Sequence, residues 1–453
     1  MRLLWLLIPA LSVWAAEPIV TVDAGHAIGK IKAMQDLDNG PLCQRGIVDL
    51  SRYYKELGVR YVRLHDVPWT YDNAFDINYV FPKWEADPEK QENYDFTQTD
   101  FYLKTITSLN IKIIYRLGYS AEYKTAVHHN APPDSYSKWT KICTQIIRHH
   151  NEGWANGQKA GIQYWEIWNE PDGKGFWAGT PEQFYRLYVE TAKAIKQAYP
   201  SLKVGGPALA SDLGFLEGLL KYCHEHQAPL DFISWHIYTQ SPEEVAQRAR
   251  RVHELAVQYG YGKAESILDE WNWGPSGWRK LFVDPVASRT YFDTMQNARG
   301  GAFDAAVLTE LQDAPVDIAT YYSGTTLMWG MFTSSGAPQK PYYAFLAFRR
   351  LLDTPRRVAV QATGDPELRA LAGLSEDGKL LRVLISNTGQ ATKDYQFEFK
   401  NLPWQAARCE EQIVDEGRDL AARRTVRLER SNAVLHEQIK GPSVTLLSIS
   451  ANP

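Results

Sequence analysis

Short apolar runs alternate with longer amphipathic stretches from Ile19 to Leu311, and this alternation restricts the possible folds more than any other feature of the sequence. From Pro181 to Tyr199, for example, apolar residues recur at intervals of three and four, which is typical of a helix with one buried face. Eight such strand–helix units predict an α/β protein with a (β/α)8 TIM barrel. An open doubly wound sheet is the alternative, but no Gly-x-Gly-x-x-Gly motif follows any of the strands. The predicted strands are Ile19 to Ala24, Val59 to Leu64, Ile111 to Leu117, Ile162 to Trp168, Lys203 to Gly206, Phe232 to Ile237, Ser266 to Glu270 and Ala305 to Thr309.

The pattern changes after the last predicted helix, Pro341 to Leu352. From about Arg357, short alternating runs are separated by Gly, Asp and Asn, which is typical of antiparallel strands joined by turns. We therefore expect a leader at 1–15, a barrel at 16–352 and a small antiparallel β-sandwich at 353–453. The residues directly after the leader are a candidate for joining the sandwich.

The first fifteen residues have the layout of a signal peptide. Arg2 supplies a positive charge, residues 3–14 are apolar, and Val13 and Ala15 stand at the small-residue positions of a cleavage site. The segment is too short to span a bilayer, and no later apolar run reaches the ~18 residues that a membrane span needs. We expect a secreted or periplasmic protein, and a buried N-terminal strand is the alternative.

Charge and composition exclude several classes of function. The net charge of −4, from 49 Lys and Arg against 53 Asp and Glu, lacks the concentrated positive field that nucleic acid requires. The 4 cysteines form no Cys-x-x-Cys pair, and we expect no metal or organic cofactor. The 15 Trp, 25 Tyr and 16 Phe side chains suit either stacking on a sugar or filling the core.

Two glutamates stand at the ends of predicted strands. The segment YWEIWNEPD (164–172) ends the fourth strand, and its proline places Asn169 and Glu170 at the carboxyl end. The segment ILDEWN (267–272) ends the seventh strand with Glu270. In a closed barrel these strands face each other across the mouth, where barrel active sites lie. Two opposed carboxyls are what hydrolysis of a glycosidic bond requires, and two solvated strand-end glutamates are the alternative.

Asn169-Glu170-Pro on the fourth strand, with Glu270 on the seventh, resembles the clan A glycoside hydrolases. The longer run most resembles family 39, which includes β-xylosidases and α-L-iduronidases, all retaining enzymes. The resemblance covers nearly the whole barrel, and its ordered set of motifs is more specific than Asn-Glu-Pro alone. The other matching segments are VRLH (62–65) on the second strand, PP (132–133) to Trp139 before the third helix, GGPA (205–208) on the fifth strand and ISWHIY (233–238) on the sixth.

The resemblance implies that Glu170 is the general acid/base and Glu270 the nucleophile. Such a pair lies about 5–5.5 Å apart, and the charge of Glu270 would help to keep Glu170 protonated at rest. Asn169 is placed to bind the sugar 2-hydroxyl, and Arg63 to hold the nucleophile ionised. Further candidates for binding substrate, each with a structural role as the alternative, are His65, His236, Tyr238, His26 and Trp329.

Two other acidic residues compete with this pair. Strand alternation turns Asp269 to the opposite side from Glu270, and Glu310 lacks a flanking motif. We therefore do not expect either of them in the catalytic pair.

The sixth-strand motif bears on the sugar. In the iduronidase branch its His is followed two positions on by Lys, a cation suited to a uronate, whereas this chain has Tyr238, as in the xylosidase branch. Arg279 and Lys280 offer another route to an acidic sugar. We expect a retaining, exo-acting glycosidase for a neutral sugar such as a β-xyloside. The alternatives are a non-catalytic glycan-binding protein, a transglycosylase and an endo-acting glycanase.

Two long loops, 67–100 and 272–285, are predicted to lie at the barrel mouth. The first is longer than the family pattern, and the segment 327–332 also departs from it. Aromatic residues at or beyond strand ends predict surfaces that stack on sugar rings. These residues are Trp168, Trp235, Trp271 and Trp273, together with the aromatic residues of the 67–100 loop.

Overall fold

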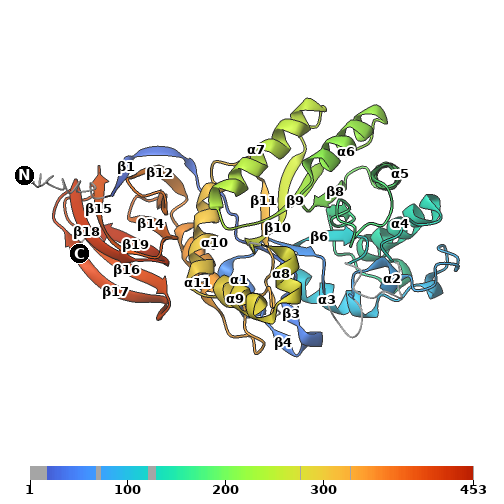
Figure 1. Ribbon diagram of the computed structural model, residues 1–453, viewed down its shortest axis with the longest axis horizontal. Coiled ribbons are helices and arrows are strands. Elements are labelled where there is room, and N and C mark those ends of the chain that lie inside the picture. Colours follow the sequence, from blue (N-terminus) through green and yellow to red (C-terminus); the bar gives the residue numbers. More distant parts are fainter. Residues whose placement is uncertain (1–17, 68–72, 121–128, 276, 327, 452–453) are drawn as a thin grey trace, which may run out of the picture.

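A computed structural model describes residues 18–67, 73–120, 129–275, 277–326 and 328–451 (Figure 1). The predicted leader therefore lies outside the described residues. Within them, no helix combines the length and apolar character that crossing a membrane would take.

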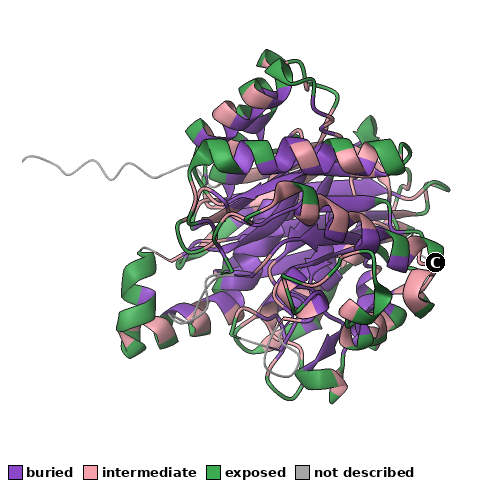
Figure 2. Cartoon of the chain, turned by 90° about the vertical axis from the view of Figure 1, so that its right-hand side faces the viewer, coloured by how far each residue is buried: buried purple, intermediate pink, exposed green. Residues whose placement is uncertain are grey.

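Eight parallel strands close into a barrel, as predicted. They are β2 (Asp36–Asp38), β5 (Tyr61–Leu64), β6 (Lys112–Leu117), β7 (Tyr164–Ile167), β8 (Lys203–Leu209), β9 (Phe232–Thr239), β10 (Glu265–Trp273) and β11 (Ile318–Tyr321). Most of the helices that surround them expose one side and bury the other, while the strands at the centre are buried (Figure 2). These helices are α1 (Ser51–Leu57), α3 (Thr97–Ser108), α4 (Tyr136–Glu152), α5 (Pro181–Ala198), α6 (Leu213–Glu225), α7 (Pro242–Gln258), α10 (Ala298–Glu310) and α11 (Lys340–Leu351).

Local sequence signals explain several of these boundaries. Helix α5 begins with Pro181 in its first turn and a capping box in which Thr180 and Gln183 bond reciprocally. Helix α1 ends at Gly58, whose φ of 62° is the left-handed conformation that glycine adopts without strain. The predicted helices over Pro181 to Tyr199 and Pro341 to Leu352 are confirmed within one residue at each end.

Two of the eight predicted barrel strands are not part of the barrel. The run Ile19 to Ala24 belongs to β1 (Ile19–Lys30), which pairs with strands of the C-terminal sheet and not with the barrel. The first barrel strand is the three-residue β2, which sequence periodicity misses because it is short and two of its residues are aspartates. Asp36 is held there by Arg60, at 2.6 Å.

The run Ala305 to Thr309 lies inside α10, and the eighth strand is β11. Residues 300–308 of α10 are all buried, because the barrel covers one side of the helix and the C-terminal sheet the other. A helix buried all round has a continuous apolar run, which periodicity cannot distinguish from a buried strand.

The C-terminal domain is one nine-stranded sheet, in the order β17-β16-β19-β14-β13-β12-β1-β15-β18. Its neighbours are antiparallel except for β1 and β15. Strands from both ends of the sheet contribute to one apolar core, so the sheet folds over on itself as a sandwich. Besides β1, its strands are β12 (Arg356–Thr363), β13 (Leu368–Leu374), β14 (Leu380–Asn387), β15 (Thr392–Lys400), β16 (Ala407–Asp415), β17 (Arg418–Leu428), β18 (Ala433–Lys440) and β19 (Ser443–Ala451).

Helices α10 and α11 lie between the barrel and the sheet (Figure 1). The hydroxyl of Ser386 donates to the Ala302 carbonyl at 2.6 Å, and Arg369 pairs with Glu310 at 2.8 Å. Glu310, one of the competing carboxylates, therefore joins the two domains. The 4 cysteines are free and buried.

The remaining short elements decorate the barrel. Between β2 and α1 lie the hairpin strands β3 (Leu42–Cys43) and β4 (Val48–Asp49), and short helices interrupt the two long loops. These are α2 (Ile77–Val80) in the first loop, and α8 (Trp278–Val283) with α9 (Pro285–Gln296) after β10.

Candidate active site

Glu170 and Glu270 meet at the carboxyl end of the barrel. Glu170 follows β7, Glu270 lies in β10, and His236 of β9 stands between them. The Nδ1 atom of His236 is 2.8 Å from Oε1 of Glu170 and 3.5 Å from Oε2 of Glu270. The ligand-type atoms of the three residues all lie within 4.8 Å of one another. The structure therefore brings the two predicted glutamates together in one site.

The backbone after β7 places Asn169 and Glu170 in the mouth. Trp168 and Glu170 have φ angles of 73° and 47°, in the left-handed region that side chains rarely adopt. Backbone bonds hold this turn, from Trp168 N to Leu117 O and from Glu170 N to Ala208 O, each at 2.9 Å. Side chains along a regular strand alternate between its two sides. The turn after β7 breaks this alternation, so that Asn169 joins Glu170 in the site and Trp168 points away from it.

A strand irregularity also changes the predicted place of Asp269. Pairing of β10 with β9 shifts register between Leu268 and Glu270, so that Asp269 is an extra, unpaired residue. A bulge of this kind lets two consecutive side chains face one side. Asp269 Oδ2 consequently reaches Arg63 Nε at 3.1 Å, and Glu270 Oε1 reaches Arg63 Nη1 at 2.9 Å. The prediction that Asp269 turns away from Glu270 is wrong.

Arg63 of β5 is the centre of the site and is fully buried. Its guanidinium donates to Glu166 at 2.7 Å, to Asp38 at 3.1 Å and to the amide oxygen of Asn169 at 2.6 Å. With Asp269 and Glu270, four carboxyl groups surround this one cation. We call Arg63, Asp38, Glu166, Asp269 and Glu270 the charged floor of the site.

Two acids of the charged floor are stabilised in their protonated form. Burial raises the pKa of Asp38 well above its usual value, and the nearby charge of Glu270 adds to this against the attraction of Arg63. Burial and the charge of Asp269 raise the pKa of Glu166 to about 8. A carboxylic acid kept neutral in this way can remain beside other carboxyls without like-charge repulsion.

Asp269 and His236 are stabilised in their charged forms. Burial opposes ionisation of Asp269, but the charges of Arg63 and His236 outweigh it and lower the pKa of Asp269. Burial likewise opposes protonation of His236, but the charges of Glu270 and Asp269 raise its pKa well above the usual value. The two cations, Arg63 and His236, therefore face the two carboxylates of Asp269 and Glu270.

The two catalytic candidates are shifted in opposite directions. Burial raises the pKa of Glu170; the negative charge of Glu270 adds to this, and the hydrogen bond from His236 only partly offsets it. Burial would also raise the pKa of Glu270, but the charges of His236, His65 and Arg63 and a hydrogen bond from Tyr238 lower it. The Tyr238 hydroxyl donates to Oε2 of Glu270 at 2.8 Å. Opposite shifts in neighbouring carboxyls separate an acid from a nucleophile.

Of the other predicted site residues, Asn169, His65 and Trp329 lie at the barrel mouth, whereas His26 does not. Asn169 is fully buried, and its Nδ2 atom has no acceptor among the described residues, so this donor is available to a ligand. His65 lies 3.8 Å from Glu270 and 3.3 Å from Asp66, and Trp329 lies against the ring of Tyr238 at 5.5 Å. His26 lies on β1 of the C-terminal sheet, outside the barrel. The prediction of His26 as a site residue fails because the strand before it does not belong to the barrel.

Most of the predicted sugar-stacking tryptophans are buried in the core. Trp168 packs against Trp139 at 5.3 Å and Trp177 at 5.0 Å, because the turn after β7 directs it outward between the helices. The other three, Trp235, Trp271 and Trp273, are 0%, 1% and 7% exposed.

The aromatic residues of the first long loop give a similar result. Phe81 is buried against Tyr94, at 4.9 Å, whereas Trp69 and Tyr71 lie outside the described residues. Trp278 of α8, which is not among the aromatic residues predicted from the sequence to stack on sugars, has its ring 5.2 Å from that of Tyr238.

Among the residues that the structure describes, two groups have side chains of the types that bind metals, placed close enough to share an ion. One is Glu170, His236 and Glu270, where a protonated His236 offers no lone pair to an ion. The other is Asp100, His149 and His150, between α3 and α4. There His149 donates Nδ1–H to the Trp154 carbonyl at 2.7 Å and pairs with Asp100 at 3.0 Å. Neither group argues for a metal in the reaction.

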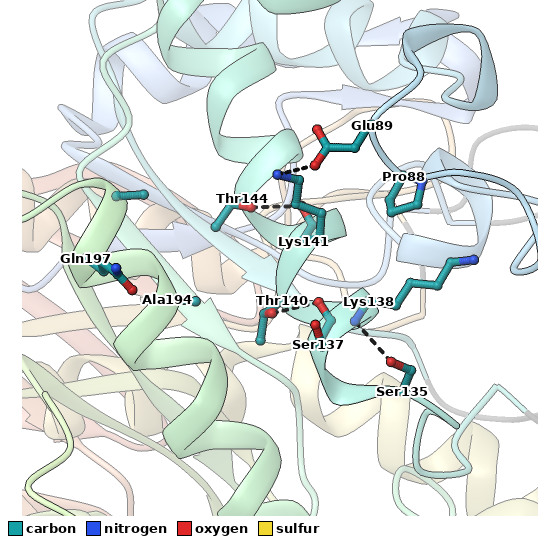
Figure 3. A pocket seen from close by; sticks show the side chains of 11 residues that line it. Pro88, Glu89, Ser135, Ser137, Lys138, Thr140, Lys141, Thr144, Ala194 and Gln197 are labelled. Atoms are coloured by element: carbon teal, nitrogen blue, oxygen red, sulfur yellow. Dashed lines mark hydrogen bonds and ion pairs between the residues drawn. The ribbon is translucent and has the colours of Figure 1, made fainter.

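A surface groove of about 750 Å³ lies beside α4 and α5, on the outer side of the barrel (Figure 3). Its walls carry serine, threonine and lysine side chains, with an ion pair between Lys141 and Glu89 at 2.5 Å. The residues of this groove do not include the glutamate pair or its partners, so the candidate site remains the barrel mouth.

Comparisons with known proteins find a matching family model and related enzymes. The family model of glycosyl hydrolases family 39 matches residues 38–361, from the first barrel strand into the C-terminal sheet. A β-xylosidase of Caldicellulosiruptor saccharolyticus is 27% identical over 375 residues, which cover 73% of this chain and 71% of the relative. A β-xylosidase of Geobacillus stearothermophilus is 25% identical over 347 residues, 67% of this chain and 64% of the relative.

A solved structure extends the likeness in fold to both domains. The glucosidase of Croceicoccus marinus superimposes with a TM-score of 0.77 at 24% sequence identity, covering 96% of this chain and 100% of the other. Because the family model spans well over half of the sequence and the site holds the paired glutamates, the chain belongs to glycosyl hydrolases family 39 and is a glycosidase.

Proposed function

We propose that the protein is a retaining, exo-acting glycosidase that releases a neutral sugar, such as xylose from a β-xyloside. The observation that carries this proposal is the close pair of carboxyls with opposite pKa shifts. Their nearest approach, within 4.8 Å, suits direct attack on the sugar by one carboxylate. Inverting enzymes need a wider gap of about 6.5–9.5 Å, which leaves room for a water molecule.

In the first step, Glu170 protonates the glycosidic oxygen while Glu270 attacks the anomeric carbon. The carbon–oxygen bond to the leaving group breaks, and a covalent glycosyl-enzyme ester forms on Glu270. His236 donates to Oε1 of Glu170, which leaves the other oxygen of Glu170 to carry the transferred proton. Arg63 and Tyr238 each hold one oxygen of Glu270.

In the second step, Glu170 acts as the base. Once Glu270 is esterified, its charge no longer raises the pKa of Glu170, so Glu170 is ionised and accepts a proton from water. The water attacks the anomeric carbon from the face that the leaving group occupied, and the ester bond to Glu270 breaks. Asn169 donates its Nδ2–H to the sugar 2-hydroxyl, while Arg63 fixes its amide oxygen.

The surroundings of the pair support a neutral sugar and action at chain ends. Glu270 is only 5% exposed, which favours a pocket over an open groove. Tyr238 stands where a cation would meet a uronate, and its hydroxyl is already committed to Glu270. The β-xylosidase relatives support xylose as the sugar. The N-terminal apolar segment supports export of the protein.

The test determines the anomeric configuration of the product and identifies the residue that carries the covalent intermediate. NMR of the first-formed product from an aryl β-xyloside should show the β anomer, and an activated 2-fluoro-xyloside should label Glu270, as identified by peptide mass spectrometry. A first-formed α anomer, or labelling at a residue other than Glu270, would contradict the mechanism. Release of internal fragments from a xylan without terminal xylose would contradict exo action.

A further inference from the structure

An exposed apolar surface begins beside the active site and continues along α8. Its members are Trp278, Phe282, Val283 and Val286 of the loop after β10, with Met328 of the loop after β11; we call these five residues the apolar rim. Their exposed fractions are 43%, 74%, 71%, 67% and 63%, and they make up half of the exposed large apolar side chains in the described ranges. Apolar surface concentrated in this way on a soluble protein marks a binding surface.

Tyr238 connects the apolar rim to the reacting groups. Its hydroxyl donates to the proposed nucleophile Glu270, and its ring contacts both Trp278, at 5.2 Å, and Trp329, at 5.5 Å. The two indoles stack on each other with centroids 5.8 Å apart and planes 30° apart. One residue thus separates the apolar rim from the sugar-cleaving carboxylate.

Trp329, which supports this surface, is fixed in place. The rings of Tyr291 and Phe292 on α9 pack against it at 5.4 Å and 5.2 Å. Its carbonyl accepts from Ser323 N at 3.0 Å, and Gln296 donates to the neighbouring Met328 carbonyl at 2.9 Å. A surface that is already ordered loses little entropy when a ligand binds.

The apolar rim is wider than one indole. Phe282 follows Trp278 by four residues on α8, so the two side chains lie on the same side of the helix, one turn apart. Leu281 of the same helix is buried and anchors α8. A second sugar ring presents hydroxyls around its edge that require polar partners, whereas aryl and alkyl groups require only apolar contact.

We propose that the apolar rim is the binding site for an apolar aglycone, so that the enzyme releases an aryl or alkyl alcohol from its glycoside in preference to a second sugar. This proposal rests on the glycosidase mechanism given above and names the leaving group. In the first step the aglycone oxygen takes the proton from Glu170, its bond to the anomeric carbon breaks as the Glu270 ester forms, and the free alcohol departs. The apolar rim therefore acts before the water step and not during it.

The test compares two leaving groups on the same sugar. For wild type, Trp278→Ala and Phe282→Ala, kcat/KM is measured with octyl β-xyloside and with xylobiose, whose leaving groups are both alcohols. We expect the ratio of the two kcat/KM values to fall about 10-fold or more in each variant, as loss of an aromatic contact with the bound aglycone implies. Val257→Ala, an exposed site on α7 that is 54% accessible, is the matched control and should keep the ratio within about twofold.

Two additional measurements separate the possible outcomes. Phe282 is 74% exposed, so Phe282→Ala keeps the fold even if Trp278→Ala does not, and circular dichroism checks both. Hydrolysis of a trapped 2-fluoro-xylosyl-enzyme should proceed at the same rate in wild type and Phe282→Ala, because the aglycone has already left.

Three results would overturn the proposal. The first is an unchanged ratio in Phe282→Ala. The second is a wild-type dimer in light scattering that Phe282→Asp dissociates without altering the ratio, since the apolar rim would then be an interface between two copies of the chain. The third is a wild type that cleaves neither substrate nor any aryl glycoside, which would overturn the proposed function as well.

Discussion

The charged floor and the apolar rim are separated by a single side chain, that of Tyr238, and they differ in charge, in exposure and in the interactions that hold them. The five floor residues are 0–5% exposed and are held by ion pairs, whereas the five rim residues are 43–74% exposed, and Trp278 among them is held by ring contacts with Tyr238 and Trp329. Tyr238 belongs to both, through its hydroxyl and its ring.

The difference shows how the chain separates chemistry from recognition. Electrostatic interactions in a buried, preorganised site are strong, because little water or protein rearrangement competes with them. Apolar contacts at an exposed edge are individually weak and add up with area. Loss of the nucleophile in the floor should therefore alter the rate by orders of magnitude, and changes in the rim should alter mainly the choice of leaving group.

The largest effect is expected for Glu270→Gln. Without a carboxylate nucleophile the glycosyl-enzyme cannot form, and kcat should fall about 10⁴- to 10⁶-fold, as it does when other covalent catalysts lose their nucleophile. Turnover of 2,4-dinitrophenyl β-xyloside measures the loss. The matched control is Glu310→Gln, which alters the carboxyl that pairs with Arg369 at the domain junction and should retain the wild-type rate. Activity of Glu270→Gln within tenfold of wild type would show that the floor does not supply the nucleophile.

A smaller effect, which depends on the leaving group, is expected for Glu170→Gln. Loss of the general acid should lower kcat/KM about 10²- to 10⁴-fold for substrates with alcohol leaving groups, and far less for 2,4-dinitrophenol, which leaves without protonation. Sodium azide should restore turnover of the activated substrate and give β-xylosyl azide. Equal losses for both types of substrate would contradict the role of Glu170 as the acid.

The pH dependence of kcat/KM should be bell-shaped with limbs of about tenfold per pH unit. Activity requires ionised Glu270, whose pKa is lowered, and protonated Glu170, whose pKa is raised. It should therefore be lost on the acid side as pH falls through the pKa of Glu270, and on the alkaline side as pH rises through that of Glu170. Substrates that need no acid should keep their activity on the alkaline side. If kcat/KM for substrates with alcohol leaving groups also stayed constant on the alkaline side, Glu170 would be excluded as the acid.

The sequence predicted the barrel, the C-terminal sheet and the meeting of Glu170 and Glu270, because these depend on periodic patterns and on local motifs. It could not predict that Asp269 enters the site, since a one-residue bulge in β10 leaves no signal in the apolar pattern. The left-handed turn at Trp168 was equally hidden, because neither Trp168 nor Glu170 is a residue that favours positive φ.

The first and eighth strands were misplaced for a related reason. Periodicity finds the apolar surface of a segment, and β2 has two aspartates where a strand of the core would carry apolar residues. The apolar run in α10 is explained only by the sheet that packs on its outer side, which is a contact between residues far apart in the sequence. The apolar rim was missed because exposure is a property of the folded chain.

The smallest effect on turnover, within about tenfold, is expected for Glu166→Gln, which alters mainly stability. The pKa of Glu166 is raised from 4.5 to about 8, so the folded state holds a proton that the unfolded state releases as pH rises through this range. The stabilising contribution of this proton is complete below about pH 4.5 and is lost as pH rises to about 8. Glutamine is neutral throughout and still accepts from Arg63. The free energy of unfolding of Glu166→Gln minus that of wild type should therefore increase from pH 5 to pH 8, by up to ~1.4 kcal/mol per pH unit, in guanidinium titrations. A constant difference across this range would mean that Glu166 is ionised in the folded protein and that the charged floor carries one more negative charge than the two cations Arg63 and His236 balance.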